Sequence, residues 1–253
     1  MNVTSIKTHK ITPEKDQDLF AVLDKYITKL EESSVVAVTS KIVAICEGRF
    51  IGMRKVDKRE LIFEEADLVI PAEKNRYNVS LTIKNNLLIA GAGIDESNGN
   101  GFYILLPKNS QDSANKIREH LVKKFNLKNI GVIITDSRTT PLRWGVTGVA
   151  LAHSGFKPLK DYAGNEDLFG RKFLFEKLNL ADCLATTAVL VMGEGSEQTP
   201  LAIIEDVPFV EYQNRNPSKE ELAQLKIDIK DDIYESLLIN APWEKGNKKV
   251  IND

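Results

Sequence analysis

The sequence of 253 residues is poor in thiol and imidazole side chains, with two cysteines, Cys46 and Cys183, and three histidines. Two distant thiols cannot form the dense disulfide framework of a small secreted protein, so we expect a reducing, cytoplasmic setting. Because these cysteines and histidines lie far apart in the chain, they also lack the spacing of a structural zinc site.

Long hydrophobic runs and an excess of one charge are also missing. No apolar segment approaches the roughly 20 residues that cross a bilayer, and residues 1–17 lack the apolar core of a signal peptide. The 34 basic and 36 acidic residues give a formal net charge of −2. Such a balance provides no positive surface for nucleic acid or an anionic membrane, so we expect neither as a partner.

The overall composition is that of an ordinary globular protein. Hydrophobic residues make up 42% of the chain, charged residues 28% and aromatic residues 7%, which excludes disordered, collagenous and coiled-coil classes. At roughly 100–200 residues per domain, the chain forms one large domain or two small ones. No repeat of about 20 to 50 residues is visible, which argues against a solenoid.

Strand and helix patterns alternate irregularly along the chain, which predicts a mixed α+β fold. Helical spacing of apolar residues predicts helices at 13–30 (behind Thr12 as cap), 110–125, 178–192 and 217–238. Short apolar runs predict strands at 34–43, 87–90, 102–106, 129–135 and 201–206. The polar run after Thr135 is expected to end its strand, segments 61–70 and 146–153 stay unassigned, and the tail to Asp253 is expected to fray.

Three loops that follow apolar segments each carry an acidic residue: Asp95, Asp136 and Glu194. Rigid scaffolds present functional loops at such places, and carboxylate oxygens are the ligands that Mg²⁺ prefers. Solvated turns have the same composition, since Asp, Asn, Ser and Gly dominate turns in general. Both interpretations stay open from spacing alone.

Other chemistries find little support in the sequence. The glycines near the first and third acids permit phosphate-binding loops, but neither loop has a Walker or Rossmann spacing. No GxSxG motif occurs, and Cys183 lies in an apolar helical pattern where a free cysteine is usually a small core residue. Candidate cations for an anionic ligand are Lys41, Arg143 and Arg171, although each has the alternative of being an ordinary surface charge.

Six motifs occur in a fixed order: SKIV with EGR, GIDESN, IITDS, RWGVTGVALAHSG, DYAGNEDLFGR and LVMGEGSEQTP. Together, from about residue 19 to about residue 206, the chain resembles the coenzyme F(420):L-glutamate ligase family, the gamma-glutamyl ligases of the deazaflavin coenzyme. It also resembles a branch of that family associated with folate metabolism. The resemblance implies a region 1–206 of this family type and a helical C-terminal extension over 207–253.

The resemblance implies a GTP-dependent or ATP-dependent amide ligase that requires Mg²⁺ or Mn²⁺. Such an enzyme adds L-glutamate to a carboxylate acceptor, a deazaflavin coenzyme or a folate-like acid, through an acyl phosphate. The family fold is α+β with mixed sheets, and its members form intertwined homodimers.

Site residues follow from the matching motif positions. The resemblance assigns metal ligands to Asp95, Asp136, Ser137 and Glu194. Nucleotide contacts are assigned to Ser40, Lys41, Asn98, Met192, Gly193, Glu194, Gly195, Ser196, Glu197, Gln198 and Thr199. Lys41 and Arg143 are our candidates for catalytic stabilisation of the developing charge.

The chain also departs from the family pattern. Ile45 stands where the family often has a second lysine, and Thr139 and Thr140 replace a Gly-Arg pair. Loss of a cation weakens phosphate binding unless another group substitutes. Two alternatives therefore stay open: a nucleotide- or metal-binding protein without ligase activity, and an oligomeric scaffold whose acids are ordinary turn residues.

Overall fold

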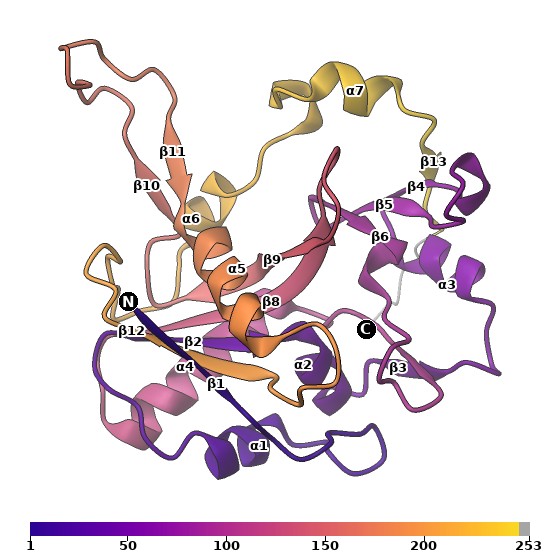
Figure 1. Cartoon of the computed structure of the whole chain (residues 1–253), viewed down its shortest axis with the longest axis horizontal. Coiled ribbons are helices and arrows are strands. Elements are labelled where there is room, and N and C mark those ends of the chain that lie inside the picture. Colours follow the sequence, from indigo (N-terminus) through magenta and orange to yellow (C-terminus); the bar gives the residue numbers. More distant parts are fainter. Residues whose placement is uncertain (248–253) are drawn as a thin grey trace.

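The chain folds around a five-stranded sheet with the strand order β1-β12-β2-β8-β9 (Figure 1). The computed structural model describes residues 1–247, so the expected fraying at Asp253 lies outside the described residues. The strands are β1 (Asn2–Ile6), β12 (Leu201–Glu205), β2 (Ser34–Thr39), β8 (Ile130–Thr139) and β9 (Val146–Ser154). β2 and β8 are parallel, and all other neighbours in this sheet are antiparallel.

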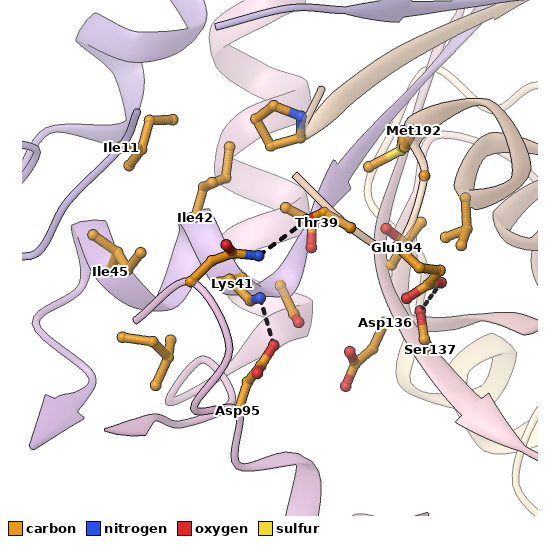
Figure 2. Close-up of a pocket in the computed structure, with 18 of the residues that line it drawn as sticks. Ile11, Thr39, Lys41, Ile42, Ile45, Asp95, Asp136, Ser137, Met192 and Glu194 are labelled. Atoms are coloured by element: carbon orange, nitrogen blue, oxygen red, sulfur yellow. Dashed lines mark hydrogen bonds and ion pairs between the residues drawn. The ribbon is translucent and has the colours of Figure 1, made fainter. Parts of the chain in front are cut away.

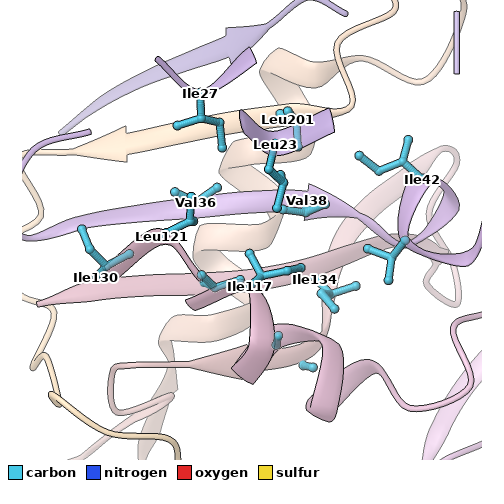
Figure 3. Packing of buried hydrophobic residues seen from close by; sticks show 14 of the residues in the cluster. Leu23, Ile27, Val36, Val38, Ile42, Ile117, Leu121, Ile130, Ile134 and Leu201 are labelled. Carbon is cyan, nitrogen blue, oxygen red and sulfur yellow. The ribbon is translucent and has the colours of Figure 1, made fainter. Parts of the chain in front are cut away.

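Helices cover both faces of this sheet because its central strands are apolar on both sides. Along β2, Val36 and Val38 face a cluster with α1 (Leu19–Tyr26) and α4 (Ser110–Phe125), shown in Figure 3. Val35 and Ala37 face the opposite way, against α5 (Leu180–Met192). The alternation along one strand therefore fixes helices on both faces of the sheet.

A second sheet has the strand order β13-β4-β5-β6. Its strands are β13 (Glu244–Lys245), β4 (Leu68–Ile70), β5 (Leu81–Lys84) and β6 (Leu87–Ala90), and its cluster includes residues of α3 (Lys58–Glu65). Short helical turns lie at η1 (Ala72–Lys74) and η2 (Gly91–Gly93). β6 contacts β8, which places the two sheets on either side of the loop after β6.

Two smaller strand pairs and a short helix complete the main body. α2 (Ser40–Cys46) follows β2 directly, and β3 (Phe50–Gly52) pairs with β7 (Phe102–Ile104). β10 (Leu159–Asp161) and β11 (Lys177–Asn179) form the base of an arm that projects from the body in Figure 1. The arm exposes four large apolar side chains: Leu168, Phe169, Leu174 and Phe175.

The segment after Asp206 runs from the central sheet to the second sheet. It contains α6 (Lys219–Gln224), η3 (Ile229–Asp231) and α7 (Glu235–Asn240), and it ends with β13 paired to β4. The expected continuous helix over 217–238 is therefore wrong. A capping box at Ser218 starts α6, but Asp228 caps a separate turn at η3, so the segment is three short pieces.

The mixed α+β class is confirmed, but several element boundaries differ from the sequence prediction. α1 begins at the cap Asp18 and not behind Thr12, whose carbonyl accepts turn hydrogen bonds from Lys15 and Asp16. The strand expected over 34–43 ends at Thr39, where α2 begins. β1 was not predicted, and segment 61–70 divides into α3 and β4.

Other predicted boundaries need smaller changes. The strand expected to end at Thr135 continues through the polar residues to Thr139, and segment 146–153 is its antiparallel neighbour β9. Cys183 is exposed and is not the small core residue that we expected. Within residues 1–247, no helix combines the length and the hydrophobicity needed to span a membrane.

Candidate functional site

A cavity of about 790 Å³ lies where the parallel strands β2 and β8 end. Carboxyl ends of neighbouring parallel strands open at the same edge of a sheet, so the segments that follow them meet there. The loop after β6 and the loop after α5 close the cavity, and residues 8–12 form a further wall. A register shift between Ile134 and Thr135 of β8 marks the point where this strand passes from the core to the cavity.

Lys41 and Asp95 form an ion pair inside the cavity. Lys41 Nζ lies 2.5 Å from Asp95 Oδ2 and donates to the carbonyl of Ser97 at 3.2 Å. Asp95 Oδ1 accepts from the Ser97 amide at 2.8 Å and from its hydroxyl at 2.7 Å. Burial acts to raise the pKa of Asp95, but Lys41 and the Ser97 donors outweigh it, so the pKa lies below its usual value and the carboxylate is ionised.

Asp136 is half-buried on β8 and faces this pair across the cavity (Figure 2). Burial is the main cause that raises the pKa of Asp136 to about 7; the negative charges of Asp95 and Glu194 act in the same direction, and the Ser137 amide and Lys41 act against it. The three acids therefore influence one another electrostatically, although Asp136 lies on β8 and the other two lie on separate loops. A cluster of negative charges that raises the pKa of a neighbouring acid also attracts cations.

The loop after α5 is tied to the other two loops by hydrogen bonds. Ser137 Oγ donates to Glu194 Oε1 at 2.5 Å, and Asn98 Nδ2 donates to the carbonyl of Gly195 at 3.0 Å. Gly193 ends α5 with a φ of 80°, which an L side chain rarely adopts. These contacts hold the acidic loops around a common space.

The structure places nearly all of the predicted site residues on the cavity wall. Ser40 is buried at the start of α2, and Lys41, Asn98, Asp95, Asp136 and Ser137 line the cavity with every residue from Met192 to Thr199. Within residues 1–247, no three acid, histidine or cysteine side chains form a ready metal cluster. The metal and nucleotide roles of these residues stay predictions.

Arg143 lies apart from the residues around the cavity. It is exposed in the turn between β8 and β9, beside Leu142 and Trp144, and it does not line the cavity. The Trp144 ring makes an edge contact with Tyr77 at a centroid distance of 6.1 Å. The structure therefore places Arg143 with an exposed aromatic group outside the cavity, and its catalytic role stays a prediction.

Sequence reasoning missed several lining residues, including Arg138, Thr135 and Thr12. The hydroxyls of Thr12 and Thr135 and Nε of Arg138 are buried, and no partner for them occurs among the described residues. Arg138 could have been predicted as a lining residue from its position two residues after Asp136, because residues i and i+2 of a strand share a face. Interpreting residues 136–140 as a turn concealed that relation.

A family model described as F420-0:Gamma-glutamyl ligase matches residues 5–206 of the chain. The chain belongs to the F420-0:gamma-glutamyl ligase family. The resemblance inferred from the six motifs is therefore confirmed, and the chain is a member of a family of ligases. The match ends at Asp206, just after β12, so the three short helical pieces and β13 lie beyond it.

Curated relatives of this F420-0:gamma-glutamyl ligase family member carry one name. The chain is 36% identical over 221 residues to the coenzyme F420:L-glutamate ligase of Methanococcus maripaludis strain C7, covering 86% of each chain. It is 35% identical to the enzyme of that name from Methanocaldococcus jannaschii, covering 83% of this chain and 86% of the relative. The Methanopyrus kandleri enzyme is 32% identical, with 77% and 82% covered. These names give no support to the folate branch.

Proposed function

We propose that the protein is a nucleoside triphosphate-dependent ligase, with GTP as co-substrate, that joins the amine of L-glutamate to a carboxylate acceptor. The names of its relatives favour a deazaflavin coenzyme precursor as the acceptor. The observation that supports this function is the arrangement of Asp95, Asp136 and Glu194 from three separate segments around one cavity, with the pKa of Asp136 raised by burial and by the other two acids.

The donor set fits a hard divalent cation. Asp95, Asp136 and Glu194 supply carboxylate oxygens and Ser137 supplies a hydroxyl, which are ligands that suit Mg²⁺ or Mn²⁺. A cation bound there would neutralise the charge of the triphosphate oxygens. It would also offset the two causes that raise the pKa of Asp136, burial first and then the negative charges of Asp95 and Glu194.

The remaining lining residues bind and orient the nucleotide. The Lys41 ammonium is a donor for phosphate oxygens, Ser40 and Asn98 supply neutral polar contacts, and the loop from Met192 to Thr199 supplies backbone amides.

An oxygen of the acceptor carboxylate attacks the γ-phosphorus, and the nucleoside diphosphate leaves. The L-glutamate amine then attacks the acyl carbon, inorganic phosphate leaves, and the amine proton passes to a water molecule or to one of the carboxylates. Arg143, in its exposed turn, is proposed to contact the acceptor.

Replacement of Asp136 tests this function. We expect Asp136→Asn to reduce glutamate-dependent phosphate release at least about a thousand-fold, because one of the three charges that hold the cation is lost. The assay contains GTP, Mn²⁺, L-glutamate and the deazaflavin precursor, and thermal unfolding checks that the fold is intact. Asp231→Asn, on the exposed η3 turn, is the matched control. Wild-type turnover by Asp136→Asn under saturating metal would contradict the assigned role.

A nucleotide- or metal-binding protein without ligase activity is the second candidate. Ile45 favours it, because this side chain is buried on the cavity wall where the family often has a lysine. Calorimetry with GTP and Mg²⁺, followed by the phosphate-release assay, separates the two functions. Nucleotide binding without glutamate-dependent phosphate release supports the second candidate.

The ligase is proposed to act as a homodimer in the cytoplasm. The four exposed apolar side chains of the arm support an association between copies, because monomers rarely expose several large apolar groups together. Light scattering at micromolar concentration measures the mass directly. Replacing Phe169 and Phe175 by serine should shift that mass toward the monomer, while a monomeric wild type would exclude the dimer.

A further inference from the structure

Arg138 is a cavity-lining cation that the proposed phosphate and metal contacts do not use. It lies on β8 two residues beyond Asp136 and lines the cavity together with Thr139 and Val146. The other lysine and arginine side chains in the described cavity wall are Lys10, on the exposed N-terminal segment, and Lys41. Lys41 is already paired with Asp95 at 2.5 Å, whereas Arg138 lies 3.4 Å from its partner Asp182.

The guanidinium of Arg138 makes little use of its donors within the described chain. An arginine carries five N–H donors. Nη2 lies 3.4 Å from Asp182 Oδ2, which is at the long limit of a hydrogen bond. Nε is buried and has no partner among the described residues. Among the described residues the one hydrogen bond of this guanidinium is the long contact with Asp182, so it keeps donors for an anion that enters the cavity.

Asp182 forms a long ion pair with Arg138 at 3.4 Å, and both of its oxygens also accept shorter hydrogen bonds. Its Oδ1 accepts from the Ala150 amide of β9 at 2.9 Å, and its Oδ2 accepts from Asn179 Nδ2 at 3.0 Å. Both contacts fix the first turn of α5 against β9. Arg138 is therefore held by Asp182 only at long range, while 33% of its side chain stays exposed and it lines the cavity.

Given the proposed function, we infer that Arg138 binds a carboxylate of the incoming L-glutamate. The planar guanidinium matches a carboxylate through two parallel hydrogen bonds. The reacting carboxylate of the acceptor loses its charge when it is phosphorylated, whereas both carboxylates of L-glutamate stay ionised throughout the reaction. The three acids nearby repel these carboxylates. Arg138 supplies the positive charge that holds the amino acid with its amine toward the acyl carbon.

Variants that remove or keep the positive charge of Arg138 distinguish binding of L-glutamate from a purely structural role. We expect Arg138→Gln to raise the KM for L-glutamate at least about ten-fold, because a charge-assisted hydrogen bond to the carboxylate is lost, and to change the KM for GTP less than about two-fold. Arg138→Lys should recover part of the loss. Arg54→Gln, an exposed arginine away from the cavity wall, is the matched control. A purely structural contact with Asp182 would instead lower the thermal unfolding temperature without a selective effect on L-glutamate.

Direct binding keeps this test independent of turnover. Calorimetry of L-glutamate with the wild-type protein, in the presence of Mg²⁺ and a non-hydrolysable GTP analogue, should give a dissociation constant that Arg138→Gln weakens at least about ten-fold. L-glutamine and the α-amide of L-glutamate then identify the carboxylate concerned, since only one of them should bind as weakly to the wild type as L-glutamate binds to the variant. Equal L-glutamate binding by wild type and variant, or none by the wild type, overturns the role of Arg138. Binding that depends on Arg138 without phosphate release contradicts only the ligase function.

Discussion

His153 is a buried titratable residue on β9, with 1% of its surface exposed. Its ring contacts Phe156 edge-on at a centroid distance of 5.5 Å, and its Nε2 has no partner among the described residues. Burial lowers the pKa of His153 to about 4, against a small opposing effect of Glu221. The folded protein therefore holds this imidazole neutral at a pH where the unfolded chain would protonate it.

The sign of the resulting pH dependence follows from proton counting. Between pH 6.5 and pH 4 the unfolded chain binds more protons at His153 than the folded chain, so stability is present above that window and is lost as the pH falls. We expect the wild type to lose about 2 kcal/mol more than His153→Leu between pH 7 and pH 5. Urea unfolding at both pH values measures the difference, and parallel losses in the two proteins would exclude this origin.

Among the elements, β9 and α5 approach each other closely at Gly148. Thr186 Oγ1 donates to the Gly148 carbonyl at 2.8 Å, and a Cβ on Gly148 would lie 2.5 Å from the Ala185 carbonyl oxygen. Neither backbone can move far, because Asp182 also joins α5 to β9 at Ala150. The absence of a side chain at this position therefore permits the helix to pack on the sheet.

A single methyl group at this contact should be costly. Gly148→Ala is expected to destabilise the fold by about 1–3 kcal/mol, which is typical of overpacked contacts, and chemical denaturation measures it. Gly52→Ala in β3 is the control, because its nearest neighbour is a Lys55 side-chain carbon at 3.8 Å. Similar unfolding free energies for the two variants would show that α5 can shift away.

Elements with a complete local pattern were predictable from the sequence. α4 and α5 combine apolar periodicity with asparagine caps at Asn109 and Asn179, and their predicted bounds are right within two residues. The junction of β2 and α2 was missed because most of residues 34–46 are buried, which leaves no clear period to distinguish strand from helix. The start of α1 was wrong because the Asp16 side chain accepts from the Thr12 amide and holds a turn there.

Only part of the candidate site was predictable from local sequence patterns. The three acidic loops were predictable because each follows an apolar segment, and the structure brings all three to one cavity. Arg138 was not, because its relation to Asp136 depends on β8 continuing through five polar residues paired with β9. That pairing is a long-range contact, which local composition does not reveal.

At the scale of the whole molecule, the division into residues 1–206 and a C-terminal extension can be tested by truncation. Val207 and Val210 are buried in the cluster with α5. Arg118, only 6% exposed, donates to Asn216 Oδ1 from Nε at 3.1 Å and from Nη2 at 3.0 Å. The first part of the extension is therefore part of the core packing, although it lies beyond the family match.

Two truncations should consequently differ in stability. Ending the chain after Asp206 should cost at least about 3 kcal/mol, because it exposes two buried valines to water and leaves the Arg118 guanidinium unpaired. Ending it after Lys226 retains those contacts and removes η3, α7 and β13, so the unfolding temperature should fall less. Equal thermal stability of both truncated proteins would show that residues 207–226 add nothing to the core.

The strand β13 has a consequence for solubility. A two-residue strand, Glu244 and Lys245, occupies the outer side of β4, and the Gly246 amide adds a hydrogen bond to the Asp67 carbonyl at 3.0 Å. Uncovered strand edges are templates on which foreign chains add further strands, and charged residues at the border discourage such growth. β13 therefore covers the outer edge of β4 with two charged residues and disfavours pairing of this sheet with another copy of the chain. Its residues do not line the cavity.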